Sequence, residues 1–203
     1  MSTRHLVQLA LLLTIVFGAQ ARFLPYLPGD PAVTRAIQSL SPGTGWVAPF
    51  LTTASAPLKF GLMALAVLGA WRLAGIRAAV VVLAAIAVEQ TLGEASKPLF
   101  GRPRPAHDLI AVMGNPTGLS FPSTFMTLYS VTIGALVVLA WRLRPGPGWL
   151  RSSVIVGGVV LLGVAACARI VPGAHWPSDA VGTYVICLSW LAVAFSAASV
   201  PSR

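Results

Sequence analysis

Residues 168–179 read A-R-I-V-P-G-A-H-W-P-S-D and join two strongly apolar segments. Pro177 suggests that a helix begins there, which would put Asp179 in its first turn. Asp179 follows His175 by four residues, so its carboxylate can accept the proton on one imidazole nitrogen and leave the other free to attack. Arg169 adds a fixed cation suited to phosphate oxygens. The alternative interpretation is an interfacial histidine beside a helix-capping aspartate.

The composition is that of an integral membrane protein. Hydrophobic residues make up 56% of the 203 residues and charged residues only 9%, whereas soluble domains carry about 25% charged residues. We expect an all-α polytopic membrane protein with a single domain over residues 1–203. The net charge is +9, but its cations are scattered among apolar runs. This pattern favours lipid headgroups and an anionic substrate as partners over nucleic acid. Cys167 and Cys187 lie in apolar segments without a CxxC motif, so neither a disulfide framework nor a zinc site is predicted.

The hydrophobic pattern predicts six transmembrane helices in one bundle. A spanning helix needs roughly 17–25 mainly apolar residues, and the candidate segments are His5–Ala21, Ala56–Leu73, Ala78–Ala95, Phe125–Trp141, Ser153–Arg169 and Ser178–Val200. The first segment has two interpretations. Arg4, the apolar run and Ala19-Gln20-Ala21 are also typical of a signal peptide with its cleavage site. We favour a retained helix, because the family described below uses six.

Loop cations indicate which end of the bundle faces outward. With an inner N-terminus, seven cations lie on each side, which decides nothing. Four of the outer cations lie in loops that look like a site, and without them seven inner cations face three outer ones; the four are Lys97, Arg102, Arg104 and Arg169. We therefore expect the site at the outer end of the bundle, in a bacterial inner membrane with the site facing the periplasm or exterior.

The first outer loop, about residues 22–55, is too long for a simple turn. Asp30-Pro31 resembles an N-cap followed by proline at the first helical position. A short helix resting on the membrane would then carry its apolar side through Ala32, Ile37 and Leu40, with Trp46 and Phe50 as interfacial anchors. An ordinary connecting loop is the alternative.

Two further polar blocks lie at the same end. The first, Lys97-Pro-Leu-Phe-Gly-Arg-Pro-Arg104-Pro105, holds cations in a proline-stiffened loop. Such cations are costly to desolvate at a bundle mouth unless they meet an anion, although a snorkelling basic anchor is the alternative. The second block, Gly118-Leu-Ser-Phe-Pro-Ser123-Thr124-Phe125, precedes the fourth helix. Ser123 can donate its hydroxyl to an anion at the helix start or simply cap the helix.

Together the three blocks resemble the type 2 phosphatidic acid phosphatase family, which is related to the vanadium haloperoxidases. The family pattern K-x6-R-P is matched from Lys97 to Arg104-Pro105, and the pattern S-R-x5-H-x3-D is matched with Ala168 in place of serine. The pattern P-S-G-H is met by Pro-Ser-Thr-Phe at 122–125. The order and the placement on one side of a six-helix bundle also agree.

The resemblance implies a role for each matched residue. His175 would be the nucleophile that becomes phosphorylated, and Asp179 would orient it. Phosphate oxygens would be held by Lys97, Arg104, Ser123, Thr124 and Arg169. No metal or other cofactor is implied, because fixed cations neutralise the phosphoryl charge.

Phe125 is the departure from the family, whose histidine at this position protonates the leaving oxygen. General acid catalysis is worth typically 10²–10⁴-fold, and phenylalanine cannot transfer a proton. A lipid alkoxide needs that proton more than a phosphate leaving group does. We therefore expect a preference for lipid pyrophosphates, such as polyprenyl diphosphates, over phosphatidic acid. His107, on the same side as Arg104, is a candidate substitute acid.

Three functions are consistent with these sequence features. The first is a membrane phosphatase or phosphotransferase that acts on a lipid phosphate at the outer leaflet. The second is a catalytically impaired protein that binds a lipid phosphate. The third is a transporter or structural bundle whose polar loops coincide with the motif.

Overall fold

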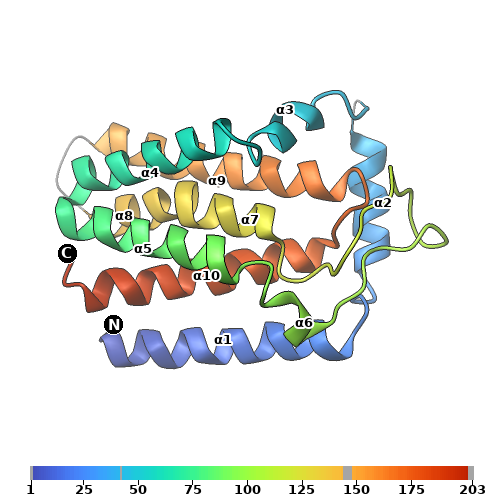
Figure 1. Cartoon of the computed structure of the whole chain (residues 1–203), viewed down its shortest axis with the longest axis horizontal. Helices are drawn as coiled ribbons and strands as arrows, with labels where there is room; N and C mark the ends of the chain where they lie inside the picture. Colours follow the sequence, from blue (N-terminus) through green and yellow to red (C-terminus); the bar gives the residue numbers. More distant parts are fainter. Residues whose placement is uncertain (1, 42, 144–147, 201–203) are drawn as a thin grey trace.

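A computed structural model describes residues 2–41, 43–143 and 148–200, and these residues form helices and loops without any strand. The predicted all-α class is therefore confirmed. The long helices run along a common axis (Figure 1), and they are α1 (Thr3–Phe23), α4 (Leu58–Ala74), α5 (Ile76–Leu92), α9 (Gly148–Ile170), α10 (Pro177–Ala197) and a composite rod built from α7 (Thr124–Tyr129), the π-helix η1 (Ser130–Gly134) and α8 (Ala135–Arg142).

Four of these stretches, among the residues described, are long and apolar enough to cross a membrane. They are Thr3–Phe23, Thr124–Arg142, Gly148–Ile170 and Pro177–Ala197. Helices also form at the two other predicted positions, but α4 and α5 have only 17 residues each. The prediction of six spans is therefore confirmed for four, and the spanning of α4 and α5 stays a prediction.

The composite rod lies at the centre of the bundle and is the most buried of the four spans. It packs closely against α10: a Cβ placed on Gly134 would lie 2.6 Å from the Leu188 side chain. Around it, small residues such as Ala70, Ala78 and Ala135 are fully buried. Small residues allow helices to approach closely in lipid, where no hydrophobic force drives them together.

The first helix packs along α10 through apolar contacts and two polar ones. Trp190 Nε1 donates to Thr14 Oγ1 at 3.0 Å, and the hydroxyls of Thr3 and Ser196 lie 2.8 Å apart. This packing favours a helix that remains part of the bundle, although its retention in the mature protein stays a prediction.

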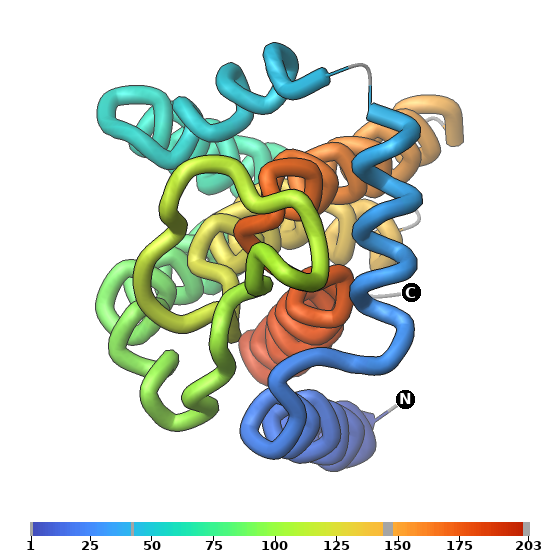
Figure 2. The backbone as a smooth tube through the Cα atoms, turned by 90° about the vertical axis from the view of Figure 1, so that its right-hand side faces the viewer, coloured from blue at the N-terminus to red at the C-terminus, as the bar shows by residue number. Residues whose placement is uncertain are grey.

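One end of the bundle carries the short helices and long loops. The short helix α2 (Asp30–Leu40) crosses this end, and the loop of residues 101–123 folds over it around the α9–α10 turn (Figures 1 and 2). The helices α3 (Val47–Thr52) and α6 (Lys97–Phe100) flank it. The start of α1 and the end of α10 lie at the opposite end of the bundle (Figure 1). All three polar blocks therefore lie together at the end that carries α2, as predicted.

The short helix α2 was correctly predicted, but its details differ. Its N-cap is Gly29, and Asp30 is the first helical residue, because the Asp30 carboxylate is buried and committed to groups described below. On the predicted apolar side, Leu40 is 84% exposed, Ala32 is exposed and Ile37 is half-buried, so its contact with the membrane stays a prediction. The buried side of the helix packs against α9 and α10.

The predicted interfacial anchors pack against protein. The rings of Trp46 and Phe50 lie edge to face with centroids 6.0 Å apart. Both are half-buried against Val47, Ala168 and Val171. They therefore attach the α3 region to the end of α9, beside the turn that carries the histidine.

Candidate active site

His175 lies in the turn between α9 and α10, and only 2% of it is exposed. The backbone N–H groups of Ala174 and His175 both donate to the Arg169 carbonyl oxygen, at 3.1 and 3.3 Å. Gly173 makes this tight turn possible with φ of +70°, a conformation that L side chains rarely adopt. The turn therefore directs the imidazole into the bundle end.

The Nε2 atom of His175 faces two hydrogen-bond donors. Arg104 Nη1 lies 3.2 Å from it and Ser123 Oγ lies 3.3 Å from it. Because an arginine can only donate, Nε2 is assigned as the acceptor and the ring proton belongs on Nδ1. The Nε2 lone pair is thus directed at the groups predicted to hold phosphate oxygens.

The Nδ1 atom of His175 faces Asp179 and a residue that the sequence analysis missed. Asp179 Oδ2 lies 3.7 Å from Nδ1, which is too long for a direct hydrogen bond. Ser120 Oγ lies 3.4 Å from Nδ1 and donates a very short hydrogen bond to Asp179 Oδ2. The serine hydroxyl therefore links the imidazole to the carboxylate.

Asp179 itself is held rigidly at the start of α10. It occupies the first turn, as predicted, and its Oδ2 accepts the Trp176 backbone N–H at 2.9 Å. Arg102, the second missed residue, donates from Nη1 to Asp179 Oδ1 at 2.6 Å. Arg102 also pairs with Asp30 at 3.3 Å, and Asp30 accepts the backbone N–H of Ser178 at 2.9 Å. This buried network joins α2, the loop after α6 and α10 behind the histidine.

Sequence patterns contain weak signals for both missed residues. Arg102 lies between Lys97 and Arg104 in the first block, where alternating arginines suggest only more phosphate binding. Ser120 lies in the run before Ser123, the residue that drew attention as a helix cap. Which arginine or serine faces the imidazole depends on how the loop of residues 101–123 folds, and periodicity does not predict that.

Electrostatics favour a neutral imidazole. Burial lowers the pKa of His175 to about 4; nearby Asp179 opposes this shift, and the cations Arg169 and Arg104 reinforce it. Burial also lowers the pKa of Arg104, whose guanidinium is anchored by the carbonyl oxygens of Thr117 at 2.8 Å and Ala174 at 2.7 Å. A neutral imidazole beside a fixed cation is the state that a nitrogen nucleophile requires.

Arg169 and Phe125 lie against each other on an adjoining cavity of about 330 Å³. The Arg169 guanidinium lies 5.7 Å from the centre of the Phe125 ring, and its buried Nε has no hydrogen-bond partner among the residues described. Phe125 is only 6% exposed and stacks at 4.9 Å on Tyr129. The Phe125 ring is therefore packed in the core. It also covers one face of the Arg169 guanidinium, whose Nε–H makes no hydrogen bond among the residues described.

The other two predicted phosphate ligands contact a carboxylate in this structure. Lys97 Nζ and Thr124 Oγ1 both bind Glu94 Oε1, at 2.9 and 3.0 Å. Glu94 and Thr124 line the same cavity as Arg169. The geometry thus brings Arg104, Ser123, Asp179 and His175 together directly. Thr124 instead lines the neighbouring cavity, and Lys97 binds Glu94, which also lines it.

His107 is exposed in the loop after Arg104, and no hydrogen bond joins it to the described residues of the site. Its role as a substitute acid stays a prediction. The described part of the chain has no cluster of three or more His, Cys, Asp or Glu residues able to hold a metal ion. Cys167 and Cys187 are both free thiols.

Fold and site together define a helical membrane protein with a histidine-centred, arginine-rich site at one end of its bundle. The family model described as PAP2 superfamily matches residues 78–201, more than half of the chain. The chain therefore belongs to the PAP2 superfamily, which confirms the resemblance seen in its motifs.

Comparison with solved structures supports the same fold over the full length. The crystal structure of the first transmembrane PAP2 type phosphatidylglycerolphosphate phosphatase from Bacillus subtilis matches with a TM-score of 0.67 and 16% sequence identity. The match covers 96% of this chain and 94% of the other. Among curated protein sequences, none matches this chain significantly. With its apolar helices, the match identifies an integral membrane protein.

Proposed function

We propose that this chain is a metal-independent membrane phosphatase that hydrolyses lipid phosphates through a phospho-histidine intermediate. The observation that carries the proposal is the setting of His175 Nε2, with Arg104 at 3.2 Å and Ser123 at 3.3 Å. A phosphate that meets these two donors would present its phosphorus to the lone pair of Nε2.

The attack on phosphorus and the charges that it creates each have a group suited to them. Nε2 attacks phosphorus and the bond to the leaving oxygen breaks, while Arg104 and Arg169 stabilise the charge on the transferred group. The developing positive charge on the imidazole is stabilised by Asp179 through Ser120. Water then attacks the phospho-histidine and releases inorganic phosphate.

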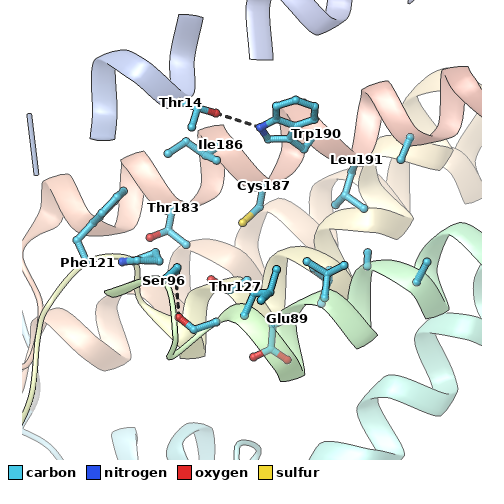
Figure 3. A pocket seen from close by; sticks show the side chains of 18 of the residues that line it. Thr14, Glu89, Ser96, Phe121, Thr127, Thr183, Ile186, Cys187, Trp190 and Leu191 are labelled. Carbon is cyan, nitrogen blue, oxygen red and sulfur yellow. Dashed lines mark hydrogen bonds between the residues drawn. The ribbon is translucent and has the colours of Figure 1, made fainter. Parts of the chain in front are cut away.

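An apolar cavity beside the site supports a lipid substrate. It has a volume of about 570 Å³ and lies between α1, α5 and α10 (Figure 3). Phe121 and Pro122, which immediately precede Ser123, form part of its wall. A hydrocarbon chain in this cavity would thus lie next to the phosphate ligands. The matched Bacillus subtilis protein is itself named for a lipid phosphate substrate.

Phe125 supports a preference for lipid pyrophosphates, such as polyprenyl diphosphates. A buried phenyl ring occupies the position from which the family's acid acts. Phosphate is a far less basic leaving group than an alkoxide and departs with less protonation. We place the site on the periplasmic or exterior side of a bacterial inner membrane, in agreement with the distribution of loop cations.

The test is to trap the intermediate. Purified protein incubated with a ³²P-labelled lipid pyrophosphate should acquire an acid-labile, base-stable label, and His175→Asn should abolish the label. His5→Asn, which changes an exposed residue at the opposite end of the bundle, is the matched control. Phosphate release that survives in His175→Asn would contradict the mechanism.

The packing of Phe125 favours one alternative, a lipid-phosphate-binding protein that has lost turnover. Lipid-phosphate binding without label or phosphate release would support it. A phosphotransferase would form the same label and pass it to an acceptor other than water. A protein that neither binds nor turns over a lipid phosphate would be a transporter or structural bundle.

A further inference from the structure

The proposed reaction lacks a proton donor at position 125, and a buried carboxyl group lies on the same cavity. Glu89, on α5, is only 8% exposed and lines the 330 Å³ cavity together with Phe125 and Arg169. We propose that Glu89 protonates the leaving oxygen of the substrate and so replaces the acid that position 125 does not supply. The inference rests on the phosphatase function proposed above.

The position of Glu89 relative to the two cavities matches that task. Glu89 lines both the polar cavity that holds Arg169 and the apolar cavity that would hold the lipid chain. In Figure 3 its carboxyl group extends from α5 away from Cys187 and Trp190, so the stem borders the apolar cavity. In a monoester the leaving oxygen joins the phosphorus to the lipid chain. A lipid chain in the apolar cavity and a phosphoryl group beside Arg169 would therefore bring that oxygen close to Glu89, which lines both cavities.

The end of α5 is in contact with the start of α7. A Cβ placed on Gly93, one turn after Glu89, would lie 3.3 Å from the Thr124 side chain. Thr124 is followed directly by Phe125. Glu89 and Phe125 thus line the same cavity from two neighbouring helices, and no long-range movement is required for Glu89 to reach it.

The surroundings of Glu89 favour its neutral, proton-carrying form. Three charged groups line the same cavity, namely Lys59 on α4, Glu94 after α5 and Arg169 on α9. None of them forms an ion pair with Glu89 among the residues described. Within the described part of the chain, its one polar side-chain contact is the amide of Gln90, which donates to Oε2. Burial of a carboxyl group that has no ion-pair partner favours its protonated form, because burial penalises the charged form.

Glu94, the other carboxyl group on this cavity, differs from Glu89 both in its exposure and in its ion pairing. Its side chain is 73% exposed and it pairs with Lys97 at 2.9 Å. Partial burial raises the pKa of Glu94, but the hydrogen bonds from Lys97 and Thr124 outweigh it and hold that pKa below its usual range. An ionised carboxylate has no proton to donate, so the geometry distinguishes the two acids.

The proton balance of the reaction closes with Glu89 alone. As Nε2 bonds to phosphorus and the phosphorus–oxygen bond breaks, the Glu89 proton moves to the leaving oxygen. A monoester thereby yields a lipid alcohol, and a pyrophosphate yields a lipid monophosphate. The Glu89 carboxylate then takes a proton from the water that attacks phosphorus, the nitrogen–phosphorus bond breaks, and Glu89 is protonated again.

This role changes the expected substrate range. A pyrophosphate stays the better substrate, but a monoester becomes a substrate whose turnover depends on Glu89. The test compares Glu89→Gln with the unmodified chain on a lipid monophosphate and on a lipid pyrophosphate. We expect kcat for the monoester to fall on the order of 10²–10⁴-fold and kcat for the pyrophosphate to fall much less. Asp108→Asn, which removes an exposed carboxylate from a loop, controls for loss of charge.

A rescue separates proton donation from a structural role. Phe125→His in the Glu89→Gln background should restore monoester turnover, because the imidazole returns a donor to the other wall of the cavity. The proposal is overturned by equal losses on both substrates, by unchanged monoester turnover in Glu89→Gln, or by selective monoester loss in Glu94→Gln instead. Failure of the phosphatase function gives a different result: the unmodified chain then releases phosphate from neither substrate and carries no label on His175.

Discussion

Arg102 Nη1 donates a 2.6 Å hydrogen bond to Asp179 Oδ1, and neither side chain is exposed. The pair is continued by Asp30 on α2, 3.3 Å from the other guanidinium nitrogen. A helix that crosses the end of the bundle is thereby tied to the residue behind the histidine. This network makes the position of His175 depend on three segments distant in sequence.

We expect Arg102→Ala to destabilise the fold by about 3–5 kcal/mol, because it leaves two carboxylates buried without their cation. Thermal unfolding of the purified protein in detergent measures the loss. Arg77→Ala, which removes an exposed arginine at the start of α5, should leave the unfolding temperature nearly unchanged. Similar effects of the two substitutions would contradict the structural role of the network.

His175 should remain neutral down to about pH 4 in the folded protein, since burial lowers its pKa to that value. The chain has only three histidines, so ¹⁵N-histidine NMR with His5→Asn and His107→Asn assigns each titration. The unfolded chain takes up this proton near pH 6.5. The stabilisation is therefore complete above pH 6.5 and is lost as the pH falls toward 4. A His175 resonance that titrates near pH 6.5 would contradict the buried, neutral state.

Ser120→Ala should lower kcat without preventing folding. Its hydroxyl lies 3.4 Å from His175 Nδ1 and bonds to Asp179, and hydrogen bonds to charged groups contribute about 1.5–3 kcal/mol. If that contribution is made in the transition state, turnover falls by about 10- to 100-fold. Ser153→Ala, on the other end of α9, is the control. An unchanged kcat would show that Asp179 orients the imidazole without the serine.

Gly173→Ala should destabilise the turn that carries His175. The added Cβ would lie 2.4 Å from the Ala111 carbonyl oxygen at φ of +70°, and the left-handed conformation alone costs about 1–2 kcal/mol. Gly163→Ala, in α9 with open space around its Cβ, should be neutral or slightly stabilising. Equal unfolding temperatures for the two variants would show that the turn accommodates a side chain.

Phe125→His, made in the otherwise unmodified chain, should raise monoester turnover more than pyrophosphate turnover, because only the alkoxide strongly needs a proton. The gain should be smaller than in the Glu89→Gln background, because Glu89 already supplies one donor. Rates on both lipids, compared with those of the unmodified chain, measure the gain. Removal of the ring also breaks its 4.9 Å stacking on Tyr129, so the unfolding temperature must be recorded beside the rates. A gain of equal size on both substrates would point to a change in phosphate binding by Arg169 instead.

The sequence by itself determined the helical class, the positions of the long helices and the end of the bundle at which the site lies. Apolar runs and helix-start signals such as Pro177 are local, so they can be recognised from neighbouring residues alone. It also singled out His175 and its motif partners, because their spacing is local too.

The tertiary structure decided which side chains meet. It brought Ser120 and Arg102 to the histidine and the aspartate, and it paired Lys97 and Thr124 with Glu94. It also placed Glu89 on the wall of both cavities. These contacts depend on how the loop of residues 101–123 folds and on how α5 packs against α7. Such long-range packing leaves no periodic trace in the sequence, so only the folded chain shows which acids share a cavity with Phe125.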